Sequence, residues 1–174
     1  MPIYTPSHNV RSVFVTGLQN AHAVERQALA LIDRQLDRLV RYPEIAEQLR
    51  SHRAETEGQL RRLEEILHSL NETHSSWRDA AMSLMGNLAA LSNSMAGDEV
   101  LKNHIVNHAF ENFEIATYTS LIAIAEAGDF ATAVPLLKAS LAEEEAMAAW
   151  VLGSLGELTL KYVGVSAEGR ASSR

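Results

Sequence analysis

The chain contains no cysteine, which excludes disulfide bonds and metal sites built on thiolates. It has no uninterrupted apolar run of about 18 residues, so we expect no membrane-spanning helix. Its first residues, Met-Pro-Ile-Tyr-Thr-Pro, lack the basic segment followed by an apolar stretch that marks a signal peptide. These absences favour a cytoplasmic protein that has no membrane partner.

Basic residues are also in short supply. Lysine and arginine number 15 against 22 acidic residues, and the formal net charge is -7 at pH 7. Basic clusters are short, such as Arg61-Arg62, and no basic patch for a nucleic-acid backbone stands out. We therefore expect no nucleic-acid partner.

The chain has 174 residues, of which 47% are hydrophobic, and this is enough for one domain with a sizeable core. We place this domain at residues 1–165. Residues 166–174 are rich in glycine, serine and arginine, and we expect them to form a disordered tail.

Signals for strands are absent, and the breaks between apolar segments predict helices. Pro43 suits the first position of a helix, and Tyr42 before it ends the previous one. The pairs Gly97-Asp98 and Gly128-Asp129 each combine a residue that ends helices with one that begins them. The predicted helices cover, in order, residues 7–41, 43–70, 76–94, 99–127 and 130–162.

This pattern predicts an all-α fold. The turns after residues 41 and 127 are short, so the four long helices pair as two antiparallel hairpins. The segment between the hairpins is long enough to cross the length of a bundle, and it carries the extra helix at 76–94. Two antiparallel hairpins joined by such a crossover have the connectivity of a ferritin-like four-helix bundle.

The helix predicted over 99–127 carries two glutamates at or beside its apolar face. Steps of three and four residues place Glu111 and Glu114 in the inward stripe, one turn apart. A buried carboxylate without a partner costs several kcal/mol. These two side chains therefore need partners or a ligand.

Matching glutamates occur on the other long helices. Glu25 and Glu55 are 30 residues apart, and so are Glu114 and Glu144. Counted from the turns at Tyr42 and Gly128, the four glutamates lie 17, 13, 14 and 16 residues away. At about 1.5 Å per residue they fall within roughly one helical turn of the same height. We predict that their carboxylates meet in the middle of the bundle.

Four or five carboxylates cannot all stay charged in a dry core, so they must be protonated or bind a multivalent cation. Carboxylates with a little imidazole suit iron or manganese and accept zinc. We predict a centre that holds two iron ions, with manganese or zinc as the alternatives. Its candidate metal ligands are Glu25, His52, Glu55, Glu111, Glu114 and Glu144.

Two of these candidates have a second interpretation. Glu111 either binds the metal or hydrogen-bonds a residue that does. His52 lies one turn before Glu55, so it either points at the metal or donates to a carboxylate. His22 stands in the same relation to Glu25 and is a weaker candidate.

The usual di-iron bundle carries Glu-x-x-His on two helices. Here Gly58 and Met147 occupy the positions where those histidines would stand. We therefore do not expect a copy of the common di-iron site.

Residues 51–64 read Ser-His-Arg-Ala-Glu-Thr-Glu-Gly-Gln-Leu-Arg-Arg-Leu-Glu, and residues 111–118 read Glu-Asn-Phe-Glu-Ile-Ala-Thr-Tyr. These stretches resemble the second and third helix signatures of the ferritin-like YciE/YciF family, which usually has histidine where Asn112 stands. Residues 141–145 resemble its fourth helix signature, and residues 23–27 fit the first less closely. The resemblance spans residues from about 10 to 162. It implies a ferritin-like subunit, usually dimeric, with a di-metal centre and a link to stress responses.

Three functions fit these features: a di-metal oxidoreductase that handles peroxide or oxygen, an iron-binding or storage protein, and a structural or stress-interaction protein. We favour a ferritin-like di-iron or di-manganese protein and leave its catalysis open. The alternative is a helical-bundle dimer in which the metal only stabilises the fold. Apolar Val15, Leu31 and Leu39 on the outer face of the first helices predict a two-fold homodimer.

Overall fold

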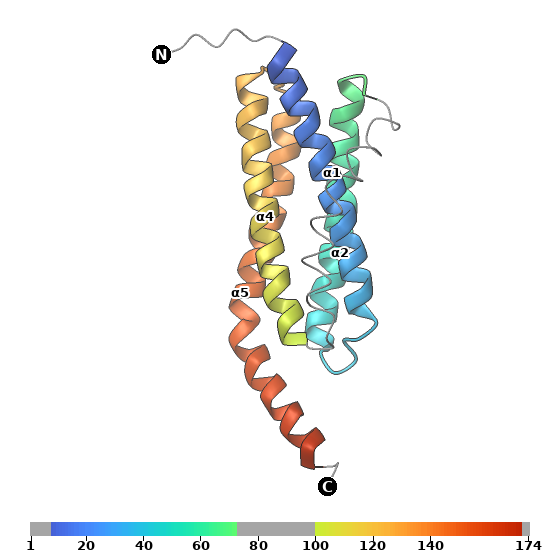
Figure 1. The fold of residues 1–174 in the computed structure, drawn as a ribbon, viewed down its shortest axis with the longest axis vertical. Coiled ribbons are helices and arrows are strands. Elements are labelled where there is room, and N and C mark those ends of the chain that lie inside the picture. The colour runs from blue at the N-terminus through green and yellow to red at the C-terminus, as the bar shows by residue number, and fades with distance from the viewer. Residues whose placement is uncertain (1–7, 73–99, 172–174) are drawn as a thin grey trace.

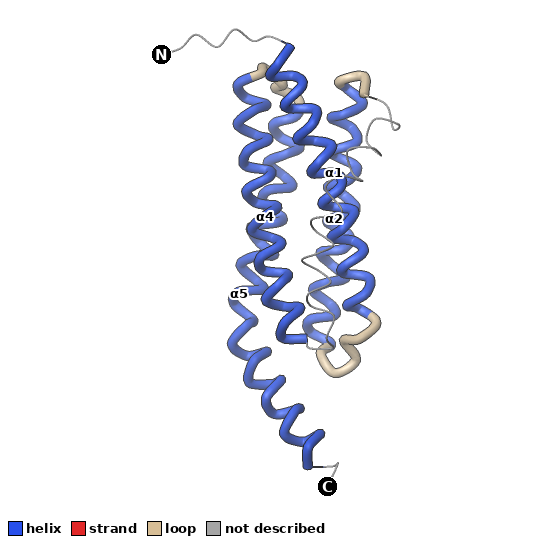
Figure 2. Tube along the Cα trace, in the orientation of Figure 1, coloured by secondary structure: helices blue, strands red, loops and turns tan. Residues whose placement is uncertain are grey.

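The computed structural model describes residues 8–72 and 100–171. Nearly all of them lie in four long helices, α1 (His8–Leu36), α2 (Pro43–Ser69), α4 (Val100–Ala127) and α5 (Ala133–Ala171). The helices lie side by side in one bundle (Figure 1), and no strand occurs in the described ranges (Figure 2). The predicted all-α four-helix bundle is confirmed. The predicted crossover helix at 76–94 and the Gly97-Asp98 pair lie outside the described residues.

Neighbouring helices alternate in direction, as two hairpins joined by a long connection require. α1 packs against α2 and α4, and α5 packs against α4 and α2, so that α2 and α4 are diagonal partners. These two diagonal helices run in the same direction (Figure 1). Within the described ranges, no helix is both long and apolar enough to cross a membrane.

The first helix ends earlier than the sequence predicts. α1 ends at Leu36 rather than near residue 41, because Leu39 and Tyr42 turn inward and are buried with Ile45. Residues 37–42 form short turns between α1 and α2, in which the Tyr42 N–H donates to the Leu39 carbonyl at 2.9 Å. Pro43 then begins α2, as the sequence predicts.

The second turn also differs in detail. The left-handed residue is Asp129, with φ of 58°, whereas Gly128 keeps a negative φ. Gly128 is needed for close approach instead, because a Cβ there would lie 2.5 Å from the Phe130 ring. That ring stacks on Phe14 with centroids 4.6 Å apart, which closes the upper end of the bundle in Figure 1.

The two largest apolar clusters lie one toward each end of the bundle, and a small third cluster of Val24, Ala28 and Phe110 joins α1 and α4. The upper core, at the end of the α4–α5 turn, includes Phe14, Leu18, Leu63, Ile66, Leu67, Leu121, Ala125 and Leu137. The lower core, at the end of the α1–α2 turn, includes Ile32, Leu39, Tyr42, Ile45, Leu49, Met147, Val151 and Leu158. Along each helix the buried polar residues separate these two groups, so the bundle has an apolar core above and below a polar layer.

The surface does not carry the apolar patch that the sequence analysis placed on the first helices. Val15 is only 8% exposed and Leu39 only 5% exposed, because both pack into the cores. Leu31 is half-buried beside Val24 and Phe110. The exposed large apolar side chains lie elsewhere, and on α1 and α4 they are Val13, Ile105 and Phe113.

α5 is longer than predicted. It continues to Ala171 and extends beyond the other helices at the lower end in Figure 1. Lys161 ties this part to the α1–α2 turn, since its Nζ lies 2.6 Å from Glu44 and over the Tyr42 ring. The predicted domain limit at residue 165 stays a prediction.

We expect Leu63→Ala to lower the free energy of unfolding by about 3 kcal/mol, because it opens a cavity in the upper core. In a chain of this size that corresponds to a melting temperature roughly 10 °C lower. Leu152→Ala removes an exposed leucine of α5 and should change stability by less than about 1 kcal/mol. Thermal unfolding of both variants checks this, and equal losses would contradict the assignment of the core.

Candidate metal centre

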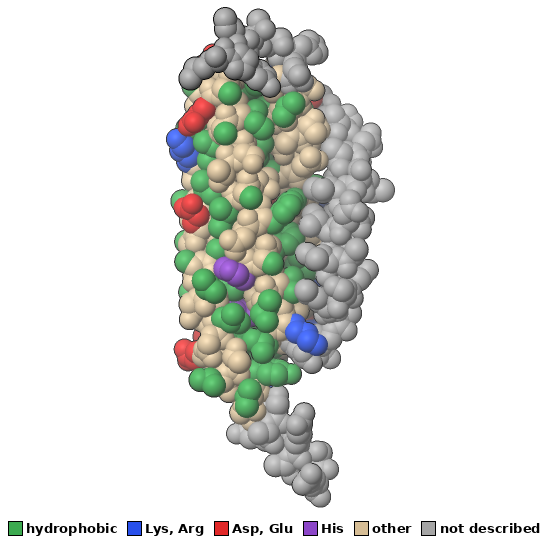
Figure 3. Space-filling view, turned by 60° about the vertical axis from the view of Figure 1, so that its left-hand side comes forward, with side chains coloured by type: hydrophobic (Ala, Val, Ile, Leu, Met, Phe, Trp, Pro, Cys, Tyr) green, Lys and Arg blue, Asp and Glu red, His purple; other side chains and the backbone are tan. Residues whose placement is uncertain are grey.

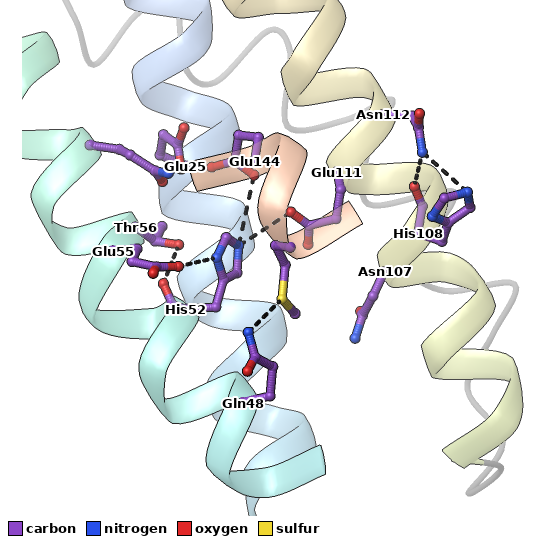
Figure 4. A network of polar contacts seen from close by, with 12 residues as sticks. Glu25, Gln48, His52, Glu55, Thr56, Asn107, His108, Glu111, Asn112 and Glu144 are labelled. Atoms are coloured by element: carbon purple, nitrogen blue, oxygen red, sulfur yellow. Dashed lines mark hydrogen bonds and ion pairs between the residues drawn. The ribbon is translucent and has the colours of Figure 1, made fainter. Parts of the chain in front are cut away.

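The polar layer between the two cores brings together side chains from all four helices. Glu25 of α1, Glu114 of α4 and Glu144 of α5 are 1%, 2% and 0% exposed. His52 of α2 and Glu111 of α4 are buried beside them. Figure 4 shows Glu25, His52, Glu111 and Glu144 pointing toward one another from separate helices. We call these five residues the buried cluster.

His52 is the connecting group of this cluster. Its Nε2 lies 3.3 Å from Glu111 Oε2 and 3.8 Å from Glu144 Oε2. Its Nδ1 lies 3.0 Å from Glu55 Oε2, and the Glu55 side chain is 38% exposed at the edge of the layer (Figure 4). The two interpretations of His52 from the sequence are therefore compatible, since one ring nitrogen meets a carboxylate and the other faces the buried cluster.

The environment of His52 favours its charged form. Burial alone would lower the imidazole pKa, but the hydrogen bonds and negative charges of Glu111 and Glu55 outweigh it and raise that pKa to about 9. In the absence of a cation the ring therefore favours its charged form near neutral pH. Thr56 helps to fix the turn that carries it, because its hydroxyl donates to the His52 carbonyl at 3.0 Å.

The buried glutamates favour the neutral form. Burial raises the pKa of Glu25 to about 8, although the hydrogen bond from Tyr118 works in the opposite direction. Burial and the neighbouring Glu111 raise the pKa of Glu144 to about 11. Burial and the charges of Glu25, Glu144 and Glu111 raise the pKa of Glu114 well above its usual range. Without a cation, these three carboxyls hold protons at neutral pH.

Several oxygens of the cluster have no hydrogen-bond partner among the described residues. They are both carboxyl oxygens of Glu114 and the Oε2 atoms of Glu25, Glu111 and Glu144. Buried polar atoms are normally satisfied, so such atoms in one place indicate a missing ligand. Oxygen donors with one imidazole are the set that iron and manganese prefer. The buried cluster therefore fits a hard or borderline divalent cation.

The six candidate ligands from the sequence occupy different places in this site. One ligand atom each from His52, Glu111 and Glu144 lies within 4.8 Å of the others, an arrangement that can hold a metal ion. Glu25 and Glu114 are buried next to them, while Glu55 lies at the edge and reaches the cluster through His52. The assignment of these six residues as metal ligands stays a prediction.

One buried contact of the cluster was not recognised in the sequence. Gln59 of α2 is completely buried, and its Nε2 donates to Glu144 Oε1. Gln59 lies on the inward stripe of α2, four residues after Glu55, and this spacing is the feature of the sequence that could have indicated the contact. The helical period alone does not distinguish a polar side chain that contacts a carboxylate from one that fills a gap.

Two further histidines, His22 and His104, contact groups outside the cluster. His22 Nε2 lies 3.0 Å from Glu64 on α2. His104 Nε2 lies 3.0 Å from the Val151 carbonyl and 2.9 Å from Ser154 Oγ, and burial lowers its pKa. These contacts assign structural roles to both residues.

A family model described as "Domain of unknown function (DUF892)" matches residues 9–164. Protein YciF of Escherichia coli strain K12 is 25% identical over 169 residues, which are 93% of this chain and 97% of that protein. The crystal structure of the E. coli stress protein YciF superimposes with a TM-score of 0.69 at 21% identity, covering 91% of this chain and 99% of that chain. The crystal structure of a Xanthomonas campestris pv. campestris protein gives a TM-score of 0.75 at 23% identity, with the same coverage. The resemblance predicted from the sequence is thus confirmed.

We expect the metal-free protein to lose stability as pH rises from about 5 to about 9. Glu25 has a pKa of about 8 in the fold against an ordinary 4.5, so the native state keeps a proton that the unfolded chain releases. This contribution is complete below the unfolded pKa and is lost as pH rises through the folded pKa. The raised pKa of His52, about 9, has the same sign.

The measurement is thermal unfolding in chelator at pH 5.5 and pH 9, where we expect a difference of roughly 10 °C. Glu25→Gln is always neutral and should make this difference smaller. Glu145→Gln removes a charge from the exposed surface of α5 and should leave it unchanged. Stability that increases over this pH range in wild type would show that the buried carboxyls are ionised.

Proposed function

The chain belongs to the YciF-like family described as a domain of unknown function (DUF892), and from that premise we propose that it is a di-metal carboxylate protein. The bundle would bind two iron ions, or manganese, with zinc as a further alternative. Glu25, His52, Glu111, Glu114 and Glu144 are the proposed ligands, and Glu55 is the proposed ligand at the edge of the site. A stress-related role is proposed by likeness to the E. coli relative, whose structure is described as that of a stress protein.

One observation carries this proposal. Three carboxyls with strongly raised pKa values lie in one layer, and four of their six oxygens lack a hydrogen-bond partner among the described residues. Such a layer adds nothing to stability if it only stays protonated and neutral, because apolar side chains of similar volume would cost less. A bound cation replaces the protons and satisfies these oxygens at the same time.

Iron or manganese bound here would supply redox chemistry toward oxygen or peroxide. The residues of this chain would orient the cation, exclude water and hold protons at defined atoms. The apolar cores above and below the layer keep solvent away, while Glu55 links the surface to His52.

The test is cation binding by the purified protein. Metal analysis of protein prepared without chelator, followed by titration of the chelated protein with Mn²⁺ at pH 7.5, should give two ions per chain. Glu114→Gln should weaken binding by at least about tenfold, and the surface control Glu145→Gln should leave it unchanged. Added Mn²⁺ should raise the melting temperature of wild type clearly at pH 7.5 and little at pH 4.5, where protons compete.

A structural function is the second candidate, and the hydrogen bonds of the cluster favour it. Tyr118 donates to Glu25, Gln59 donates to Glu144, and His52 is paired with Glu55. A hydrogen-bonded network of this kind can hold the helices without a cation. It predicts that chelation does not change the melting temperature at pH 7.5 and that Glu114→Gln destabilises the metal-free protein. The di-metal proposal predicts a lower melting temperature after chelation and a more stable metal-free Glu114→Gln variant.

We also propose that the chain forms a homodimer, through a different surface from the one that the sequence suggested. A groove of about 330 Å³ runs between α1 and α4, and its lining residues, which include Gly17, Phe113 and Leu121, carry no charge. Val13 of α1 and Ile105 and Phe113 of α4 are exposed, and Phe113 also lines the groove. Figure 3, which turns the side of α4 forward, shows hydrophobic side chains gathered along it. Uncharged apolar surface of this extent favours self-association.

Phe113→Glu should shift the protein toward monomer, because it places a charge in the middle of this surface. Leu160→Glu makes the same change at an exposed leucine of α5 and should leave the assembly unchanged. Sedimentation velocity at micromolar concentration measures both. A wild type that sediments only as monomer would rule the dimer out.

A further inference from the structure

The two diagonal helices of the bundle carry the same arrangement of polar residues. On α2, His52 is followed by Glu55 after three residues and by Gln59 after four more. On α4, Glu111 is followed by Glu114 and by Tyr118 with the same spacing. α2 and α4 run in the same direction (Figure 1), so the two series follow the same order along the bundle.

The last residue of each series makes the same kind of contact. Gln59 on α2 donates from Nε2 to Oε1 of Glu144 on α5. Tyr118 on α4 donates from its hydroxyl to Oε1 of Glu25 on α1, at 2.5 Å. Each donor thus reaches the glutamate of a helix in the other hairpin, and the two contacts correspond in the direction in which they cross the bundle.

The two acceptors are left in the same state by these contacts. In each of Glu25 and Glu144 one oxygen accepts the hydrogen bond, and the other has no hydrogen-bond partner among the described residues. The unpartnered Oε2 of Glu144 faces His52 Nε2 at 3.8 Å. Four positions after Glu25 on α1 and Glu144 on α5 stand Leu29 and Ala148, which have no side-chain donor. The donors at this spacing therefore lie on α2 and α4.

We propose that Gln59 and Tyr118 are a matched pair of positioning residues for the metal centre. Each holds one oxygen of a buried carboxylate and so directs the other oxygen to a cation. The inference rests on the proposed function, and it adds two residues that bind no metal themselves.

The chemistry of the two donors suits this role. An amide N–H and a phenol O–H are neutral, so they orient a carboxylate without competing with a cation for its charge. Both side chains are rigidly enclosed, with Gln59 completely buried and Tyr118 only 1% exposed. An apolar replacement would let the carboxylate rotate and offer either oxygen, which loosens the geometry that a metal requires.

The backbone around Glu144 is fixed by a further contact between the same two helices. Arg62, one turn after Gln59 on α2, makes two hydrogen bonds to the carboxylate of Glu143 and one to Ser140 on α5. A paired contact of this type sets the height of α5 against α2. Gln59 therefore acts on a glutamate whose main chain is already in register.

The experiment compares Co²⁺ binding by wild type, Tyr118→Phe and Gln59→Met in the full chain, first stripped of metal with chelator. Isothermal titration calorimetry with Co²⁺ gives the affinity, and the visible absorption spectrum of bound Co²⁺ reports the coordination geometry of the ion. The controls are Tyr42→Phe, the same change at the α1–α2 turn, and Gln35→Met, which breaks the reciprocal amide contact with Asn107. Gln59→Asn is a second variant at position 59, because its shorter amide should not reach Glu144.

We expect each of Tyr118→Phe and Gln59→Met to weaken Co²⁺ binding by about tenfold or more and to change the absorption spectrum. Gln59→Asn should behave as Gln59→Met. Tyr42→Phe and Gln35→Met should keep the affinity and the spectrum of wild type, even where Gln35→Met lowers the melting temperature.

The possible failures are distinct. A wild type that binds no Co²⁺ overturns the proposed function and this inference together. A wild type that binds Co²⁺ while both donor variants bind it with unchanged affinity and spectrum overturns only the inference. A response from one donor variant alone overturns the matched pair. Equal losses in the donor variants and their controls would show that general destabilisation, and not carboxylate positioning, weakens binding.

Discussion

The burial of carboxyl groups in one layer, between two apolar cores, is the constraint on which this bundle depends. The two apolar cores favour association of the helices but do not fix their relative heights, because apolar contacts have no direction. The buried layer opposes folding unless its oxygens obtain protons, hydrogen bonds or a cation. Glu25, Glu114 and Glu144 come from three different helices. Their contacts with partners can form only when the helices are aligned at the same height.

Directional contacts across the hairpins meet this requirement. Tyr118 connects α4 to Glu25 on α1, and Gln59 connects α2 to Glu144 on α5. Both contacts join helices that are far apart in the sequence, so they fix the docking of one hairpin against the other. The upper and lower cores supply most of the free energy that holds the helices together, whereas the polar layer sets the relative height at which the helices pack.

The buried cluster contains many carboxyl groups and little imidazole, and this limits the metal chemistry that it can support. One imidazole, that of His52, stands among several carboxylates, and the positions where a Glu-x-x-His bundle has its histidines hold Gly58 and Met147. Met147 is buried in the lower core and accepts a weak hydrogen bond from Gln48. A set of side chains with so few nitrogens differs from the common di-iron arrangement, and likeness of fold alone does not transfer the reactions of di-iron bundles to this chain.

The sequence by itself determined the helices, their pairing into hairpins and the height of the carboxylates. This succeeded because the helical period and the rise per residue are fixed, so that counting from a turn places a residue on a face and at a level. The equal spacing of Glu25, Glu55, Glu114 and Glu144 therefore predicted a common layer.

Only the tertiary structure decided how the side chains use that layer. Glu55 lies at its edge, bonded to His52, whereas Gln59 takes the place beside Glu144. Similarly, Val15 and Leu39 are buried although the sequence placed them on an outer face. The period of one helix sets the direction of each Cα–Cβ bond, but burial and partners depend on side chains that arrive from other helices.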